Sequence, residues 1–273
     1  MRQRTWWMYV VLICLAIFAL GPLLIFVFDA LKTEPELSSN PLGLPAHPQW
    51  HNFIDAWTQA GIAVGLRNSI IIVLGTMIGV VVIGGLAAYA MSRLQLPGQG
   101  AVMTYLLVVT SLPIQLFLVP LFFLWTKIGL YDTQFGIIVI YWAVYSPFAT
   151  LLMRSFMIGI PASYEEAARL DGAGEIGIIT RVVLPMAWPG VLTAALVSAL
   201  SAYNEFLLVL TFVQTNTKQP LSLTFFAFQQ GYSQNYVLIC ASGVIMILPM
   251  LILFLLLQRR FVEGVASQGL AAE

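Results

Sequence analysis

The sequence predicts an all-α integral membrane protein with six transmembrane helices. Hydrophobic residues make up 60% of its 273 residues and charged residues only 9%, and the mean hydropathy is +0.90. A soluble chain of this length would need far more charge to cover its surface. Six apolar segments reach the roughly 20 residues that a helix needs to cross a bilayer. Within a single transmembrane domain, residues 1–273, these spans cover about 6–30, 69–92, 101–126, 135–158, 189–213 and 237–258.

Arg2 and Arg4 precede the first span, and basic residues before an apolar run also occur at the start of a secretory signal peptide. A small-x-small cleavage pattern also occurs at residues 19–21. The apolar run continues past it to Phe28, however, which is too long for the hydrophobic region of a signal peptide. We expect a retained first transmembrane helix.

The basic residues predict the orientation. With six spans both termini lie on one side of the membrane, and eight of the twelve Lys and Arg residues fall on that side. An excess of Lys and Arg marks the cytoplasmic side, so both termini and the segment between spans four and five are expected to be cytoplasmic. The eight are Arg2, Arg4, Arg93, Arg154, Arg169, Arg181, Arg259 and Arg260; the other four are Lys32, Arg67, Lys127 and Lys218.

The long external loop at about 31–68 contains an amphipathic stretch. Four large apolar residues can share one helical face there, which predicts a short helix lying on the outer surface. Contact with lipid and contact with protein are both open, and lipid is favoured. These residues are Trp50, Phe53, Ile54 and Trp57.

Polar residues recur inside the third and fourth spans. Gln115 lies between Pro113 and Pro120, and two prolines predict a kinked helix with freed carbonyl groups. The fourth span carries Tyr141 and Tyr145 shortly before another proline. Polar groups at membrane depth usually face a cavity or a neighbouring helix, and both interpretations stay open for these residues.

The fifth span contains Glu205, the only carboxylate well inside a predicted span. Tyr203 and Asn204 precede it directly. One interpretation is that these side chains line a pathway through the membrane. The other is that Glu205 makes a structural hydrogen bond to a neighbouring subunit or to the broken backbone of another span.

A polar segment between Pro161 and Pro185 interrupts the apolar spans on the cytoplasmic side. Ser163, followed three residues later by Glu166, matches a capping box at the start of a helix. Gly172 suits the left-handed end of that helix. A second short amphipathic helix is expected to follow and to end at the second proline.

The predicted helix combines acidic and small residues. Glu165 lies with its acidic neighbour in the first turn, where the helix dipole favours negative charge. Ala167 and Ala168 have high helix propensity and little bulk, which leaves room for a neighbour to approach. Asp171 is expected to cap the turn locally. Taken singly, these features also fit an ordinary loop on the membrane surface.

The full spacing of this segment is more specific than its parts. It runs Glu166-Ala167-Ala168, three residues, Gly172, nine residues, Val182, one residue and Leu184-Pro185. It resembles the cytoplasmic EAA loop of ABC-importer permease subunits and departs only at Val182, where isoleucine is usual.

Further motifs over about residues 22–264 resemble the carbohydrate-uptake branch of those permeases. Tyr203 departs from the tryptophan that often precedes Asn-Glu, which bears on substrate fit. The matching motifs are Leu112-Pro113-Ile114-Gln115, Val119-Pro120-Leu121, Gly129-Leu130-Tyr131-Asp132-Thr133 and Tyr203-Asn204-Glu205-Phe206.

The resemblance implies a type I ABC importer permease fold with a cytoplasmic coupling helix in the loop 159–188. It implies three protein partners: a second permease subunit, usually a different chain; an ATPase dimer that binds ATP and Mg; and an extracytoplasmic sugar-binding protein that meets the external region near 214–236. The chain itself would bind no cofactor, would face membrane lipid, and would sit in a bacterial or archaeal inner membrane. No nucleic-acid partner is implied.

The resemblance also implies site residues. Coupling to the ATPase falls to Glu165, Glu166, Ala167, Ala168, Asp171 and Gly172. The candidate substrate pathway contains Gln115, Tyr145, Tyr203, Asn204 and Glu205, whose hydroxyl, amide and aromatic groups suit a sugar and suit helix packing equally.

The sequence also bears on three other functions: ATP binding by the chain itself, proton-coupled transport and catalysis within the membrane. The chain has no G-x-x-x-x-G-K-[ST] loop and so cannot bind ATP by that route. A proton-coupled secondary transporter using Glu205 is the alternative, although no inverted repeat is obvious. An intramembrane enzyme is disfavoured because His47 and His51, the only histidines, have no nucleophile or metal set around them. Cys14 and Cys240 lie in apolar runs and are interpreted as small hydrophobic residues, so neither a catalytic nor a metal site is expected.

Overall fold

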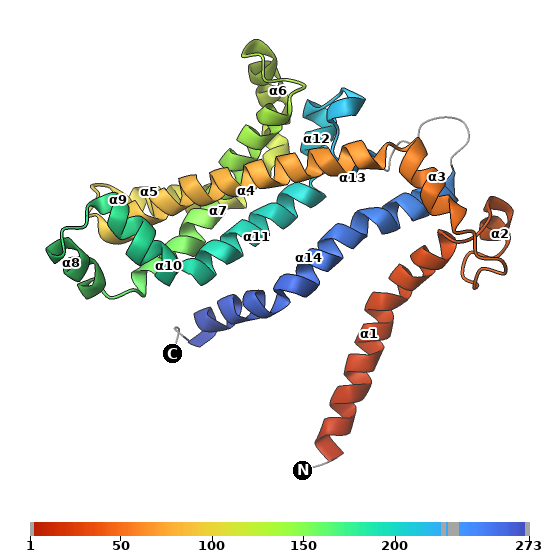
Figure 1. Cartoon of the computed structure of the whole chain (residues 1–273), viewed down its shortest axis with the longest axis horizontal. Helices are drawn as coiled ribbons and strands as arrows, with labels where there is room; N and C mark the ends of the chain where they lie inside the picture. The colour runs from red at the N-terminus through yellow and green to blue at the C-terminus, as the bar shows by residue number, and fades with distance from the viewer. Residues whose placement is uncertain (1–2, 225–227, 229–234, 271–273) are drawn as a thin grey trace.

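The computed structural model describes residues 3–224, 228 and 235–270, and its regular secondary structure there is helical with no strand. Short 3-10 turns occupy Ile114–Phe117 and Asn216–Lys218, and a π-helical turn occupies Ile179–Val183. The α-helices (Figure 1) are α1 (Gln3–Asp29), α2 (Glu34–Ser39), α3 (His51–Gln59), α4 (Ile62–Arg93), α5 (Gln99–Ser111), α6 (Leu118–Lys127), α7 (Gln134–Ile158), α8 (Ser163–Leu170), α9 (Glu175–Ile178), α10 (Leu184–Met186), α11 (Trp188–Asn204), α12 (Leu207–Phe212), α13 (Leu221–Thr224) and α14 (Tyr236–Leu270).

Within the described ranges, four helices are long and apolar enough to cross a membrane, and the number rises to six if each of two bent helix pairs is one span. The four contain Trp6–Asp29, Ile62–Arg93, Gln134–Ile158 and Tyr236–Leu255. These agree with predicted spans one, two, four and six. The second begins at Ile62, earlier than the predicted residue 69, because a left-handed Gly61 precedes it and the helix extends beyond the apolar stretch.

The third predicted span is broken more sharply than a kink. α5 and the helical segment Ile114–Lys127 meet at 91°. Leu112 is extended, as the residue before a proline prefers, and Pro113 cannot donate a backbone hydrogen bond. Pro120 is tolerated near the start of α6, where backbone N–H groups have no helical partner in any case. Only one of the two prolines therefore breaks the helix.

The fifth predicted span, 189–213, is also interrupted. α11 ends at Asn204, Glu205 is extended, and α12 begins at Leu207. At its other end, α11 meets the segment Glu175–Met186 at 81°. The break places an ionisable side chain beside free backbone groups at membrane depth.

The packed centre consists of α4, α7 and α11, which lie along one another (Figure 1). The ring of Trp142 on α7 lies against α4 and donates a hydrogen bond from Nε1 to the carbonyl of Gly75 at 2.9 Å. A Cβ atom at Gly79 would lie 2.0 Å from the same nitrogen. Glycine is therefore required at this crossing because the indole occupies the space of a side chain.

The predicted external surface helix is α3. Its N-cap residue Trp50 and its apolar residues Ile54 and Trp57 are exposed. Phe53, predicted on the same face, instead packs against the core beside the buried Ala56. α3 packs against α4 and the beginning of α14 (Figure 1). This exposed apolar face suits the interface of a bilayer.

Asp132 fastens the turn between α6 and α7 to the segment after α12. Its carboxylate accepts hydrogen bonds from the backbone N–H groups of Gln214 and Thr215, both at 2.9 Å, and from Lys218 Nζ at 3.0 Å. Asp132 adopts a left-handed φ of 54°, which Asp tolerates better than most residues. Burial alone would raise the pKa of Asp132, but the hydrogen bonds from Thr215, Lys218 and Gln214 outweigh it and hold the pKa well below its usual range.

We expect Asp132→Ala to lower the free energy of unfolding by about 2–3 kcal/mol, because hydrogen bonds to a charged group are lost. Asp132→Asn, which keeps an acceptor and tolerates the left-handed backbone, is the matched control with a smaller loss. A depressed carboxyl pKa contributes stability above the unfolded value of about 3.9 and loses it as pH falls. Thermal unfolding in detergent is therefore expected to show the wild type approaching Asp132→Asn as pH falls below about 4. A constant difference between them would contradict this account.

Candidate functional site

The helix α8 projects beyond the ends of the long helices at one end of the molecule (Figure 1). Its outer surface carries large apolar side chains: Leu170 is 89% exposed, and Tyr164 is more than half exposed. Ile176 of the adjacent α9 is 79% exposed. Isolated apolar residues on a surface are common, but several gathered on a projecting element indicate an interaction surface.

The inner surface of α8 is polar, and ion pairs and hydrogen bonds attach it to α4 and α9. Glu165 is only 3% exposed and forms an ion pair with Arg93 at the end of α4. Arg169 lies 3.8 Å from Glu165 and 3.0 Å from Glu175 on α9. The hydroxyl of Tyr89 on α4 donates a hydrogen bond to Glu175 Oε2 at 3.0 Å. We call these five residues the α4–α8 cluster.

The six predicted coupling residues divide between these surfaces. Glu165 points inward to the α4–α8 cluster and Ala168 is partly buried. The outward and exposed members are Glu166, Ala167, Asp171 and Gly172.

The predicted capping box at Ser163 is wrong. α8 already includes Ser163, its N-cap is Ala162, and no side chain caps the first turn. The backbone N–H groups of Glu165 and Glu166 instead donate to the carbonyl of Ala162, at 3.0 and 3.1 Å. The helix thus starts one residue earlier than a capping box requires.

The predicted left-handed end of α8 is confirmed. Gly172 has a φ of 84°, and the Ala173 N–H donates to the Ala168 carbonyl at 2.9 Å. Such a bond spanning the last turn, with glycine in the left-handed region, is a common helix ending. Asp171 is the C-cap residue of α8, and its backbone N–H, not its side chain, makes the capping hydrogen bond by donating to the Ala167 carbonyl.

The second helix does not end at Pro185 as predicted. α9 passes through the π-helical turn Ile179–Val183 into α10, which includes Pro185 in its first turn. The wider π turn accommodates a proline that cannot donate to the preceding turn. The chain turns at Ala187 instead.

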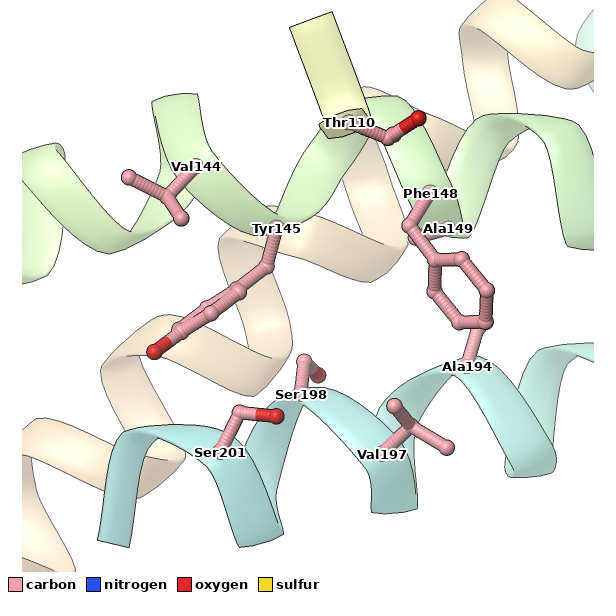
Figure 2. A pocket seen from close by; sticks show the side chains of 9 residues that line it. All are labelled: Thr110, Val144, Tyr145, Phe148, Ala149, Ala194, Val197, Ser198 and Ser201. Atoms are coloured by element: carbon pink, nitrogen blue, oxygen red, sulfur yellow. The ribbon is translucent and has the colours of Figure 1, made fainter. Parts of the chain in front are cut away.

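A cavity of about 330 Å³ opens between α5, α7 and α11. Tyr145 of α7 faces Ser198 and Ser201 of α11, with Phe148 across the cavity (Figure 2). Its lining combines hydroxyl groups with aromatic and aliphatic surface. Pockets of this kind, mostly apolar with a few polar groups, are typical small-molecule sites. Residues of the lining include Thr110, Tyr145, Phe148, Val197, Ser198 and Ser201.

Glu205 lies at the break between α11 and α12. Its carboxylate accepts hydrogen bonds from the N–H groups of Leu208, at 2.9 Å, and Val209, at 3.2 Å. It also accepts one from the Tyr141 hydroxyl at 3.3 Å, and the Tyr141 ring contacts the Tyr145 ring in a tilted arrangement with centroids 5.5 Å apart. The structure thus contains a hydrogen bond to broken backbone, but that backbone belongs to the same predicted span as Glu205 and not to another span as expected.

The other predicted pathway residues do not gather at this cavity. Tyr203 is buried, and its hydroxyl donates to the Met246 carbonyl of α14 at 2.7 Å. Asn204 is exposed and donates to the Leu200 carbonyl of its own helix. Gln115 is exposed in the turn between α5 and α6.

Two lining residues, Ser198 and Thr110, were missed from the sequence. Ser198 and Ser201 are three positions apart, which places them on one face of a helix. That spacing of small hydroxyl residues in an apolar helix was the available signal. In the described parts of the chain, His, Cys, Asp and Glu side chains form no group of three or more that could hold a metal ion.

The fold is that of a transport permease. It resembles the crystal structure of a bacterial ABC transporter involved in the import of the acidic polysaccharide alginate, with a TM-score of 0.82, 22% identity, and coverage of 95% of this chain and 97% of that one. Residues 80–267 match the family described as binding-protein-dependent transport system inner membrane component. The chain belongs to this family.

Similar proteins extend over almost the whole chain. The diacetylchitobiose uptake system permease protein NgcG of Streptomyces coelicolor is 33% identical, over 96% of this chain and 87% of that protein. The trehalose transport system permease protein SugB of Mycobacterium tuberculosis is 31% identical, over 97% of each. The probable ABC transporter permease protein YurM of Bacillus subtilis is 34% identical, over 96% of this chain and 86% of that protein.

These comparisons confirm the predicted permease family and helical permease fold. The protein is a multi-pass inner-membrane transport component rather than an enzyme. The binding-protein-dependent assignment does not favour the proton-coupled alternative.

Proposed function

We propose that this chain is a transmembrane subunit of an ATP-driven, binding-protein-dependent importer of a sugar, an oligosaccharide or a related polyol or sugar derivative. It forms half of a pathway that opens alternately to either side of the membrane. The observation that carries this proposal is the projecting helix α8, whose apolar outer surface has no cover in the described chain while its inner surface is bonded to α4.

The outer surface of α8 suits an ATPase partner. Leu170 and Ile176 are almost fully exposed, and burying such side chains against a protein contributes roughly 1.5–3 kcal/mol each. Glu166, Ala167, Asp171 and Gly172 lie beside this surface and are assigned to docking. ATP and Mg are bound by the ATPase dimer, and its closure displaces α8.

The central cavity suits a sugar. Hydroxyl groups of Thr110, Ser198 and Ser201 can exchange hydrogen bonds with sugar hydroxyls, and the rings of Tyr145 and Phe148 offer apolar faces for the sugar ring. Relatives named for diacetylchitobiose, trehalose and melibiose, raffinose and stachyose support this class of substrate. Tyr145 is retained as a pathway residue, whereas Glu205 acts by holding the broken span.

The surfaces of the chain suit the remaining partners. The apolar window Trp6–Asp29 of α1 has no buried residue, and the N-terminal part of α1 diverges from the other helices (Figure 1). Near its other end, Phe26 lies against Gly243 of α14. The diverging part is assigned to lipid and the second permease subunit. The external binding protein is assigned to the region 214–236, of which residues 225–227 and 229–234 lie outside the described residues. The described part borders a polar hollow of about 370 Å³ between α3 and the loop around Asn216–Gln219. Both termini are placed in the cytoplasm with α8.

Reconstitution tests the proposal. The chain is purified with its associated subunits and placed in liposomes, and uptake of a panel of labelled sugars is measured with external binding protein and internal ATP. We expect uptake that needs ATP, the binding protein and this chain, and that stops with a hydrolysis-deficient ATPase subunit. Flux through the isolated chain driven by a pH gradient alone would contradict the proposal and indicate the proton-coupled alternative.

A further inference from the structure

We propose that Arg93 is a positioning residue that fastens the coupling helix α8 to the end of α4, so that displacement of α8 moves α4 directly. This rests on the proposed importer function and adds the path by which force reaches the membrane. Along the chain, α8 is joined to α7 on one side and to α9 on the other. Arg93 gives it a third attachment, to a helix far from it in sequence.

The guanidinium of Arg93 lies where three segments meet. Its Nε donates to Glu165 Oε1 on α8, and its Nη2 donates to the Ile160 carbonyl between α7 and α8, at 2.8 Å. The Arg93 and Glu165 side chains are 13% and 3% exposed. A largely buried pair with several charge-assisted hydrogen bonds fixes geometry far better than an exposed pair does.

A second connection runs in parallel. Arg169 of α8 binds Glu175 of α9, and Glu175 accepts a hydrogen bond from Tyr89 of α4. Tyr89 and Arg93 are four residues apart and therefore lie on the same face of α4. The α4–α8 cluster thus closes a ring of contacts from α4 through α8 and α9 back to α4.

This arrangement connects the partner surface to the cavity. The outer surface of α8 is exposed and apolar, whereas its inner surface is held by α4. α4 packs along α7 and α11, and these two helices supply most of the cavity lining, including Tyr145 and Ser198. Movement imposed on α8 therefore reaches the cavity through α4, a helix that is not adjacent to α8 in the sequence.

Double substitution separates this role from simple stabilisation. Removing one member of a buried ion pair leaves an unpaired charge and destabilises strongly, whereas replacing both members by apolar residues costs much less. We expect Arg93→Ala and Glu165→Ala singly to reduce the amount of complex that assembles with the ATPase. The double variant is expected to restore assembly, while uptake per assembled complex and per ATP hydrolysed stays at least about fivefold below the wild type.

Arg154→Ala is the matched control. Arg154 Nε donates to the Met91 carbonyl at 3.1 Å, so its loss removes an arginine bond between α7 and the same end of α4 but leaves α8 attached. Uptake per assembled complex is expected to stay near the wild-type value. A double Arg93/Glu165 variant with wild-type uptake per complex would overturn the inference.

Tyr89→Phe provides a second, milder test that does not depend on recovering the double variant. It keeps the ring in place and removes only the hydrogen bond to Glu175, and we expect uptake per ATP to fall at least about twofold. An unchanged ratio would overturn the parallel connection. Absence of ATP-dependent uptake by the wild-type complex would instead refute the proposed function, so the two failures are distinguishable.

Discussion

Gly172→Val is expected to reduce ATP-dependent uptake at least about tenfold while the chain still inserts in the membrane. Gly172 has a φ of 84°, and a Cβ atom there would meet no other atom within 4 Å. The cost is therefore conformational: the left-handed region is unfavourable by about 1–2 kcal/mol for an L-residue and more for a β-branched one. The end of α8 must rearrange, which shifts α9 and separates Arg169 from Glu175.

Gly174→Val is the matched control for this experiment. Gly174 lies two residues away, is also free of close neighbours, and has φ −74° and ψ 165°, which valine adopts readily. We expect its uptake to stay within about twofold of the wild type, since a compatible surface change alters free energies by about 0.5 kcal/mol or less. Uptake is compared in reconstituted complexes at equal ATPase content. Equal loss in both variants would show that bulk, and not the left-handed backbone, matters.

Glu205→Leu is expected to have the largest effect on stability. The carboxylate satisfies the N–H groups of Leu208 and Val209 at the start of α12 and accepts from Tyr141. Unsatisfied backbone groups cost several kcal/mol in the hydrocarbon region, and about 1–3 kcal/mol each where a protein interior shields them. We expect a clear fall in the thermal unfolding temperature in detergent and loss of uptake.

Two further variants show whether the loss in Glu205→Leu comes from the missing hydrogen-bond acceptor. Glu205→Gln keeps an acceptor for the α12 backbone and is expected to be milder than Glu205→Leu in both measurements. Asn204→Ala removes an exposed side chain bonded only within α11 and is expected to change stability by about 0.5 kcal/mol or less. A proton carrier would behave otherwise: Glu205→Gln would then leave stability intact and abolish a pH-driven flux.

Local patterning in the sequence predicts a large part of the fold. The apolar stretches locate the long helices α1, α4, α7 and α14 because twenty apolar residues suffice to define a span. The position of Gly172 after a short helix predicts its left-handed conformation. The spacing from Glu166 to Pro185 indicates the permease family.

Contacts between residues far apart in the chain cannot be predicted from local sequence patterns. The resemblance assigns Glu165 to coupling with the ATPase, but it does not predict the partner that the structure gives it, Arg93, which is 72 positions earlier in the chain. Glu205 is an isolated carboxylate in the sequence, and only the break after α11 supplies backbone donors for it. Neither partner can be read from local spacing, because long-range packing selects it.

Local sequence also predicts only some of the helix breaks, because the effect of a proline depends on where the preceding helix ends. Pro113 and Pro120 look alike in sequence, yet one ends a helix and the other lies in a first turn. The difference depends on where the preceding helix ends. The same limit explains why Tyr145 lines the cavity whereas Gln115 and Asn204 do not: the bend decides which faces meet.

The most direct test of the central claim is site-specific photo-cross-linking from Leu170, the most exposed apolar residue of α8, in the complete membrane complex. We predict a covalent product with the ATPase subunit, detected by mass, and its weakening when Gly172→Val is introduced. A probe at Leu44, exposed in the segment between α2 and α3 that is proposed to be external, is the control and should give no such product. Equal ATPase cross-linking from both positions, or none from Leu170 in a complex that still transports, would contradict the assignment of α8 as the coupling helix.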